Sequence, residues 1–352
     1  MSMSIRPRYR VSGLSLIELM IALLIGTFLM LGLVQVFSAS REAYRLSEGL
    51  ARVQENGRFA LDYLQRDIRM AGHFGCVNDQ ARLLTPDIMR SHFTAGDPLD
   101  FNISIQGFDG GPPGVLLNPA PLANTDSIAL RFLSGSGVPL NSIDTASRVA
   151  SFNPARWPVL SQDGVTNPVL FGIADCAYAD VFRAEATSNG SVTVPASVDL
   201  ERYGTSPEGG PATLYRAEVI YYYIALGASG LPSLYRARLG NIVGPSEELV
   251  EGIENLQFRY GLDRSADVNQ PTGYIETEGN ATAINADMSN WRRVGQVQVA
   301  LQVASPNPAT SLQAQAENQS WMLDANQTAP DDRRFRQVYQ STIALRNRLY
   351  GN

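Results

Sequence analysis

Residues 14–34 read LSLIELMIALLIGTFLMLGLV, an apolar run in which Glu18 is the only ionisable side chain. A helix of about 20 apolar residues spans the hydrocarbon core of a bilayer, so this run has the length of a membrane-crossing helix. Arg6, Arg8 and Arg10 precede it, and a basic segment of this kind stays on the cytoplasmic side. The run therefore predicts a single-pass anchor that carries the rest of the chain to the opposite side of the membrane.

Glu18 interrupts this apolar pattern. A carboxylate inside a membrane helix costs roughly 2.5–3.5 kcal/mol on insertion scales, and less toward the interface. We therefore expect Glu18 to have a partner. The alternative is that it lies in the headgroup layer and has no role.

The residues around Glu18 form a pattern. Gly13 is followed by Leu14, a hydrophobic residue, and Glu18 lies at the fifth position after Gly13. The arrangement resembles the prepilin processing site, although most members of that family have Phe where this chain has Leu14. The apolar run follows the cut and survives it, whereas an ordinary secretory signal loses its apolar region.

The resemblance implies a function for each of these residues. A prepilin peptidase would remove residues 1–13 as a class III leader by cutting between Gly13 and Leu14, and would N-methylate Leu14. The new α-amino group of one subunit would pair with the Glu18 carboxylate of another, since a mismatched subunit leaves a charge unpaired. Glu18 would then set the axial register of helices in a filament.

The helical pattern continues beyond the membrane segment. No Pro occurs between residues 8 and 85, and apolar residues recur at steps of three, four and seven up to Ile68. Gly72 and Gly75 then mark an end. The sequence predicts one helix over residues 14–70, roughly 85 Å long. Its first half would be membrane or filament core, and its second half would pack against the domain that follows.

Residues 71–352 have the pattern of a β-rich periplasmic domain. Short β-favouring runs are separated by Gly, Pro, Asn and Asp. The expected strands are residues 127–133, 169–174, 217–226, 233–239, 256–262, 294–303 and 338–345. No repeated strand–helix alternation occurs, which disfavours a parallel nucleotide-binding sheet. We expect an α+β, pilin-like fold, with one long helix packed against mainly antiparallel sheets.

Several further stretches resemble the PilW-type minor pilins of type IV pili, and more distantly the J-type pseudopilins of type II secretion. They are DIRMAG at 67–72 with Gly-Cys at 75–76, PSLYR at 232–236, LVEGIENLQFRYG at 249–261, WRRV at 291–294 and STIALRNR at 341–348. Together, in this order behind the N-terminal motif, they extend over most of the chain.

The resemblance implies a structural subunit. As a minor pilin it would help prime or cap pilus assembly, in adhesion and twitching motility. Its partners would be the prepilin peptidase, other minor pilins, the major pilin, inner-membrane lipid and a large tip adhesin. It would lie first in the inner membrane with its C-terminal domain in the periplasm, and then in the filament at the tip. The alternatives are a J-type pseudopilin at the tip of a secretion pseudopilus and a membrane-anchored periplasmic enzyme or binding protein.

Charge disfavours a nucleic-acid partner. The formal net charge is −6, and it becomes about −9 once the three leader arginines are removed. A protein that binds nucleic acid needs a basic face. The two cysteines, Cys76 and Cys176, indicate a disulfide because the periplasm is oxidising; the alternative is two buried free thiols.

The sequence lacks several common catalytic motifs. The sequence has no Walker A loop, no HExxH and no Gly-x-Ser-x-Gly elbow, so we expect no enzyme and no cofactor. In relatives, the stretch after Tyr-Gly often continues as an Asp-rich loop that looks able to bind calcium. Here Asp263, Asp267 and Asn269 lack the spacing of an EF-hand loop, and we expect a solvated turn in place of a metal site.

Overall fold

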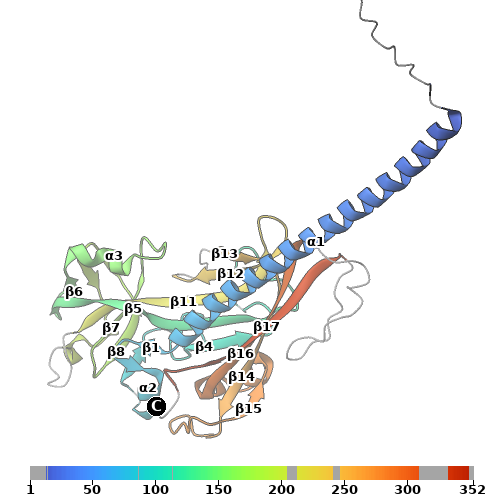
Figure 1. Ribbon diagram of the computed structural model, residues 1–352. Helices are drawn as coiled ribbons and strands as arrows, with labels where there is room; N and C mark the ends of the chain where they lie inside the picture. The colour runs from blue at the N-terminus through green and yellow to red at the C-terminus, as the bar shows by residue number, and fades with distance from the viewer. Residues whose placement is uncertain are drawn as a thin grey trace, which may run out of the picture.

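The computed structural model describes residues 13, 15–85, 87–112, 114–203, 212–240, 246–308 and 332–348. Its main helix, α1 (Leu16–Met70), has 55 residues and extends far beyond the rest of the molecule (Figure 1). At 1.5 Å per residue it is roughly 82 Å long. Ser15 was expected inside the helix but is its N-cap, and Gly72 adopts a positive φ of 76° just after the helix ends.

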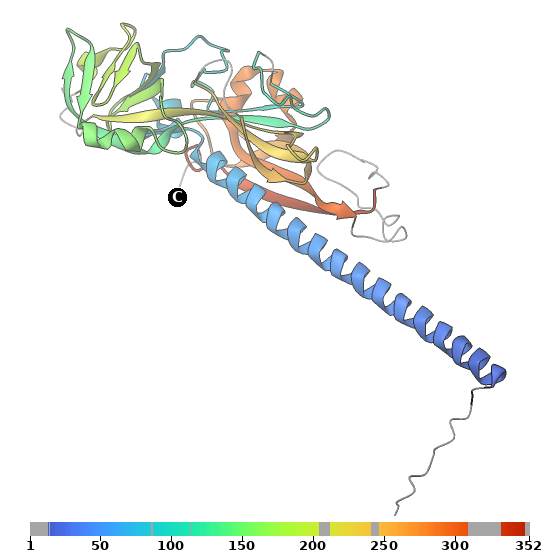
Figure 2. The ribbon, with the colours of Figure 1, turned by 90° about the horizontal axis from the view of Figure 1, so that it is seen from above.

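The two halves of α1 have different surroundings. From Leu16 to Phe37 the large apolar side chains are exposed. The second half is buried on one face, where Val53, Ala60, Leu64 and Ile68 recur at helical spacing. Figure 2 shows this half lying along the domain and the first half projecting from it.

Within the described residues, eleven strands form one mixed sheet. The order is β3-β8-β7-β11-β5-β6-β10-β9, with β4 on β5, β12 on β11 and β13 on β12. All of these pairs are antiparallel except β3–β8. The strands are β3 (Met89–Ser91), β4 (Ile105–Phe108), β5 (Ser127–Asp144), β6 (Val149–Phe152), β7 (Leu170–Ala174), β8 (Ala179–Arg183), β9 (Ala186–Ser188), β10 (Ser191–Thr193), β11 (Thr213–Leu226), β12 (Pro232–Arg238) and β13 (Ser246–Glu251).

A second, antiparallel sheet of the described chain has the order β15-β14-β16-β17. Its strands are β14 (Ile253–Asp263), β15 (Ile275–Gly279), β16 (Val294–Pro308) and β17 (Arg334–Ala344). A hairpin of β1 (His73–Phe74) and β2 (Val77–Asn78) follows α1 directly. The short helices are α2 (Asp79–Leu84), α3 (Trp157–Leu160), α4 (Ala281–Asn285), η1 (Pro154–Arg156), η2 (Leu200–Arg202) and η3 (Met288–Arg293).

The buried face of α1 packs against both sheets. Its apolar residues join one core with side chains such as Ile128, Phe258 and Leu301. Gly57 lies at the closest approach, because a Cβ there would lie 2.4 Å from the ring of Tyr339 on β17. A glycine in the middle of a helix costs roughly 1 kcal/mol relative to alanine, and here it lets the strand come close.

The expected fold class is confirmed. All seven expected runs lie in or at the ends of strands, and the long helix packs against mainly antiparallel sheets. The extent of β5 was underestimated, because its second half, residues 134–144, contains Gly135, Gly137 and Pro139, which are typical of turns. The parallel pair β3–β8 was not expected, since both strands are short.

Candidate assembly surface

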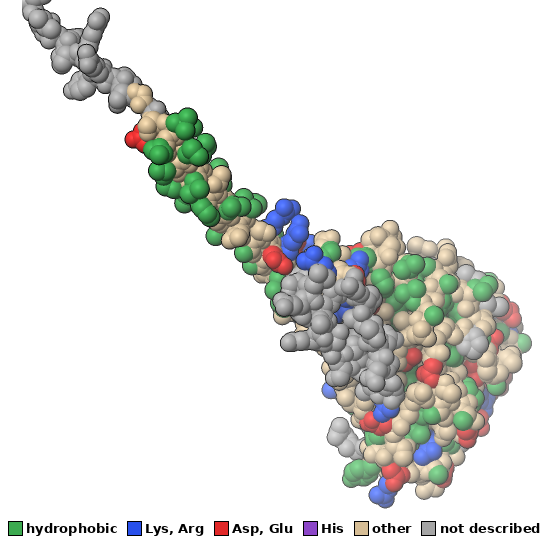
Figure 3. Space-filling view, turned by 90° about the vertical axis from the view of Figure 1, so that its right-hand side faces the viewer, with side chains coloured by type: hydrophobic (Ala, Val, Ile, Leu, Met, Phe, Trp, Pro, Cys, Tyr) green, Lys and Arg blue, Asp and Glu red, His purple; other side chains and the backbone are tan. Residues whose placement is uncertain are grey.

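The free half of α1 is the largest exposed apolar surface of the described chain. Figure 3 shows hydrophobic side chains around this half of the helix. Of the described helices, α1 alone is long and apolar enough to cross a membrane, and none of its most apolar stretch is buried within the molecule. Monomeric soluble proteins rarely expose so large an apolar surface, so this one calls for an apolar environment around it, such as lipid or other apolar helices.

Glu18 lies at the start of this surface and forms a capping box with Ser15. The Ser15 backbone N–H donates to Glu18 Oε2 at 2.9 Å, and the Ser15 hydroxyl donates to the same oxygen at 3.0 Å. In return the Glu18 N–H donates to Ser15 Oγ at 3.3 Å. Both bonds to the carboxylate use Oε2, and within the described residues Oε1 accepts no hydrogen bond.

Ser15 was not singled out from the sequence, although Ser-x-x-Glu ahead of an apolar run is the signature of a capping box. The box fixes the Glu18 carboxylate at the helix end and leaves one oxygen for an outside donor. Gly13 is exposed, with no atom within 4 Å of the position of a Cβ. Leu14 and residues 1–12 lie outside the described residues, so the structure places only one side of the expected cut.

Cys76 and Cys176 are joined in a disulfide with a Cα–Cα distance of 4.8 Å. Cys76 lies in the turn of the β1–β2 hairpin, and Cys176 lies between β7 and β8. The bridge therefore ties the segment that follows α1 to the large sheet.

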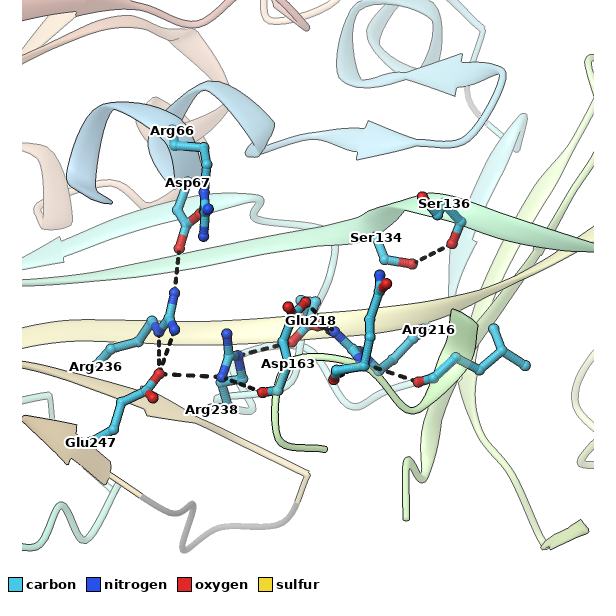
Figure 4. Close-up of polar contacts among 12 residues, drawn as sticks. Arg66, Asp67, Ser134, Ser136, Asp163, Arg216, Glu218, Arg236, Arg238 and Glu247 are labelled. Atoms are coloured by element: carbon cyan, nitrogen blue, oxygen red, sulfur yellow. Dashed lines mark hydrogen bonds and ion pairs between the residues drawn. The ribbon is translucent and has the colours of Figure 1, made fainter. Parts of the chain in front are cut away.

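The last turn of α1 is also held by a buried carboxylate, that of Asp67. The Tyr222 hydroxyl on β11 donates to Asp67 Oδ2 at 2.6 Å, and Arg236 on β12 lies 3.5 Å from the same oxygen. Figure 4 shows Arg236 between Asp67 and Glu247 of β13, with Arg238, Glu218 and Arg216 continuing the network across the sheet. The helix is therefore coupled to three neighbouring strands by polar contacts.

Tyr222→Phe tests this coupling. Burial, and then the charge of Asp67, raises the pKa of Tyr222 well above its usual value, so its hydroxyl stays protonated and donates. Loss of a buried hydrogen bond to a charged group is expected to lower the free energy of unfolding by about 1.5–3 kcal/mol. Urea denaturation of the full chain measures this loss. The exposed Tyr274→Phe is the control, and equal effects of the two substitutions would contradict the prediction.

In the loop that begins at the end of β14, the Asp263 carboxylate accepts its hydrogen bonds from the loop itself. Asp263 is 4% exposed and accepts hydrogen bonds from the backbone N–H groups of Ser265, Thr272 and Gly273. These contacts lower its pKa despite burial. Asp267 accepts from the N–H of Asn269 at 2.9 Å. In the described part of the chain no three His, Cys, Asp or Glu residues come together as a metal site, and these carboxylates organise a turn.

Comparison with known families bears on these features. Residues 8–34 match the prokaryotic N-terminal methylation motif, and residues 221–347 match the model of type IV pilus-assembly protein W. The resemblance to PilW-type pilins is confirmed. The PilW match covers β12 to β17, and of these strands β13, β16 and β17 pack against α1.

No curated protein matches this chain. Among solved structures, a type IV-like pilin from Thermus thermophilus is similar at a TM-score of 0.30 and 9% identity, over 84% of this chain and 98% of that one. The methylation motif implies processing by prepilin peptidase and a single-pass membrane anchor.

Proposed function

We propose that this chain is a minor pilin that primes or caps type IV pilus assembly from the tip. The observation that carries the proposal is the exposed apolar half of α1, which begins at the Ser15–Glu18 capping box and ends where a large domain begins. Residues 1–13 are removed as a leader, residues 14–70 anchor and then enter the filament, and residues 71–352 remain periplasmic until assembly. A bulky domain suits a filament tip better than a repeating lattice.

The Ser15–Glu18 geometry supports a register contact between subunits. Because both Ser15 donors bind Oε2, Oε1 of Glu18 is available to the α-amino group of Leu14 in a neighbouring subunit. Such a pair forms in the low-dielectric helix bundle, where a charge without a partner is strongly unfavourable. A subunit shifted along the axis loses the contact, so the pair favours one axial position.

Glu18→Ala is expected to reduce incorporation into filaments at least about tenfold, which corresponds to roughly 1.4 kcal/mol. Quantitative immunoblots of sheared filaments and of inner membranes measure it, and the amount in membranes should not fall. Ser15→Ala is the control, since it removes the cap and keeps the carboxylate. If Glu18→Ala subunits entered filaments at the normal level, Glu18 would have no register function.

The partners we propose are other minor pilins, the major pilin and a large tip adhesin. Crosslinking in membranes followed by capture of this chain tests them. Recovery of several pilins supports the proposal, whereas recovery of secretion components indicates a J-type pseudopilin. In a strain that lacks prepilin peptidase the chain should retain residues 1–13 by intact mass. If the function of the chain did not depend on the peptidase, the chain would be an anchored enzyme or binding protein outside any filament.

A further inference from the structure

A hollow of 340 Å³ lies beside α2, β3 and η3, on the domain and away from the apolar half of α1. Arg82, Arg90 and Arg292 line it together with His92, and its one acidic lining residue is Asp87. Asp87 is well exposed and pairs with Arg90 at 3.7 Å. The lining therefore carries an excess of positive charge.

The charge behind this lining is also unbalanced. Asp79 is buried and is shared by two arginines, at 2.6 Å from Arg82 and 2.8 Å from Arg348. Arg292 is the third arginine of the group, and no carboxylate lies within ion-pair distance of it in the described chain. Two guanidinium groups thus contact the Asp79 carboxylate, and that of Arg292 lies near enough to interact with all three charges.

Hydrogen bonding leaves this group unsatisfied. Arg82 is 4% exposed, and its terminal nitrogens donate to the carbonyls of Phe101 and Asn102, at 3.0 and 2.9 Å. The Nε atoms of Arg82 and Arg292 are buried, and neither has a hydrogen-bond partner within the described residues. Buried polar groups in native proteins are nearly always paired, and an unpaired one calls for an explanation such as a bound ion. Burial, and then the charge of Arg82, also lowers the pKa of Arg292.

We propose that this hollow binds an oxyanion through Arg292 and Arg82, either a free phosphate-like anion or a carboxylate presented by a protein. Guanidinium groups form paired, charge-assisted hydrogen bonds with both kinds of anion. Arg82, Arg348 and Arg292 carry three positive charges and Asp79 carries one negative charge. A bound anion would supply further negative charge at this site. The site is separate from the apolar helix and does not depend on the register function of Glu18.

The test uses the full-length chain in a nonionic detergent at constant ionic strength. Isothermal titration with sodium phosphate is expected to give saturable binding with a dissociation constant on the order of 1 mM or tighter. Arg292→Gln is expected to weaken binding at least about tenfold, since it removes the charged fork. Arg156→Gln, an exposed arginine on η1, is the charge-matched control and should change binding by less than about twofold.

A second titration distinguishes the source of the anion. A short Asp- and Glu-containing peptide is compared with its Asn and Gln counterpart. Tighter binding of the acidic peptide than of phosphate supports a protein carboxylate, and binding of phosphate alone supports a free anion. No saturable binding of either probe up to about 20 mM, or equal losses in Arg292→Gln and Arg156→Gln, would overturn the proposal.

The melting temperature separates binding from a structural role of Arg292. In anion-free buffer Arg292→Gln should melt at the same or a higher temperature than the parent chain, because it removes a half-buried charge that has no ion-pair partner in the described chain. Phosphate should raise the melting temperature of the parent and not that of the variant. A lower melting temperature of the variant in anion-free buffer would mean that Arg292 stabilises the fold, and would also overturn the proposal.

Discussion

Asp79→Ala is expected to lower the free energy of unfolding by about 3–5 kcal/mol, the usual effect of breaking a buried ion pair from one side. The Asp79 carboxylate is 1% exposed and lies between Arg82 and Arg348, and it also accepts from the Ser104 hydroxyl. The Arg348 guanidinium also donates hydrogen bonds to the backbone carbonyls of Trp291 and Val294. Without Asp79, two buried guanidinium groups lose their shared counterion, and the end of the chain loses its link to α2.

Denaturant unfolding of the full chain measures this loss. Asp62→Ala is the control, because Asp62 is 65% exposed and lies 4.0 Å from Arg58. An exposed pair of that kind contributes at most about 0.5 kcal/mol. Equal losses from the two substitutions would show that the Asp79 cluster does not stabilise the fold.

The cluster also predicts a pH dependence. Burial alone would raise the pKa of Asp79, but Arg82, Arg348 and Ser104 outweigh burial and hold it below its usual value of 3.8. The stabilisation is therefore complete above about pH 4 and is lost as the pH falls through the lowered pKa. Asp79→Asn should remove this part of the acid sensitivity. An unchanged dependence of stability on pH below about pH 4 would contradict the assignment.

Cys76→Ser is expected to cost about 2–5 kcal/mol. The bridge joins residues 100 positions apart, and the chain-entropy model gives about 4.7 kcal/mol for a loop of that length. The reason is that the unfolded chain without the bridge has more conformations to lose on folding. Urea unfolding with and without reductant measures the effect.

The double variant Cys76→Ser/Cys176→Ser is the matched control for the disulfide. It should be as stable as either single variant, because each one removes the same bridge. Intact mass of the exported chain, before and after reduction, should differ by two hydrogens. Two free thiols in the exported chain would contradict the prediction.

Local patterns in the sequence predicted the helix and the main strands. Apolar residues such as Leu64 and Ile68 follow the 3.6-residue period of α1, and Val297, Val299 and Leu301 alternate with Gln and Ala in β16. In both elements one face is buried, and this produces a periodic pattern of apolar residues that are close in sequence. β5 beyond Leu133 has no such pattern. It is stabilised by its pairing with β6, the next strand along the chain, and with β11, where Pro139 lies opposite Thr213.

The polar sites were harder to predict for the same reason. Ser15 and Glu18 are three residues apart, so their capping box was within reach of sequence reasoning. Tyr222, which donates to Asp67, is 155 residues away from it along the chain. Arg348, which pairs with Asp79, is 269 residues away from it. No local pattern indicates which of the many arginines lies beside a given carboxylate, and only the packed fold brings them together.

The buried half of α1 has a consequence for the order of events during synthesis. This helix is among the first segments to leave the ribosome, yet its contacts include β17 and the residues just after it. Gln65 donates to Ser341 of β17, 276 residues later, and Asn347 donates to the carbonyls of Arg69 and Ala71. Contacts so distant in sequence form slowly. The apolar face of the second half of α1 therefore stays uncovered until nearly the whole chain has been made. A chain that stops before β17 lacks part of the surface against which this helix packs.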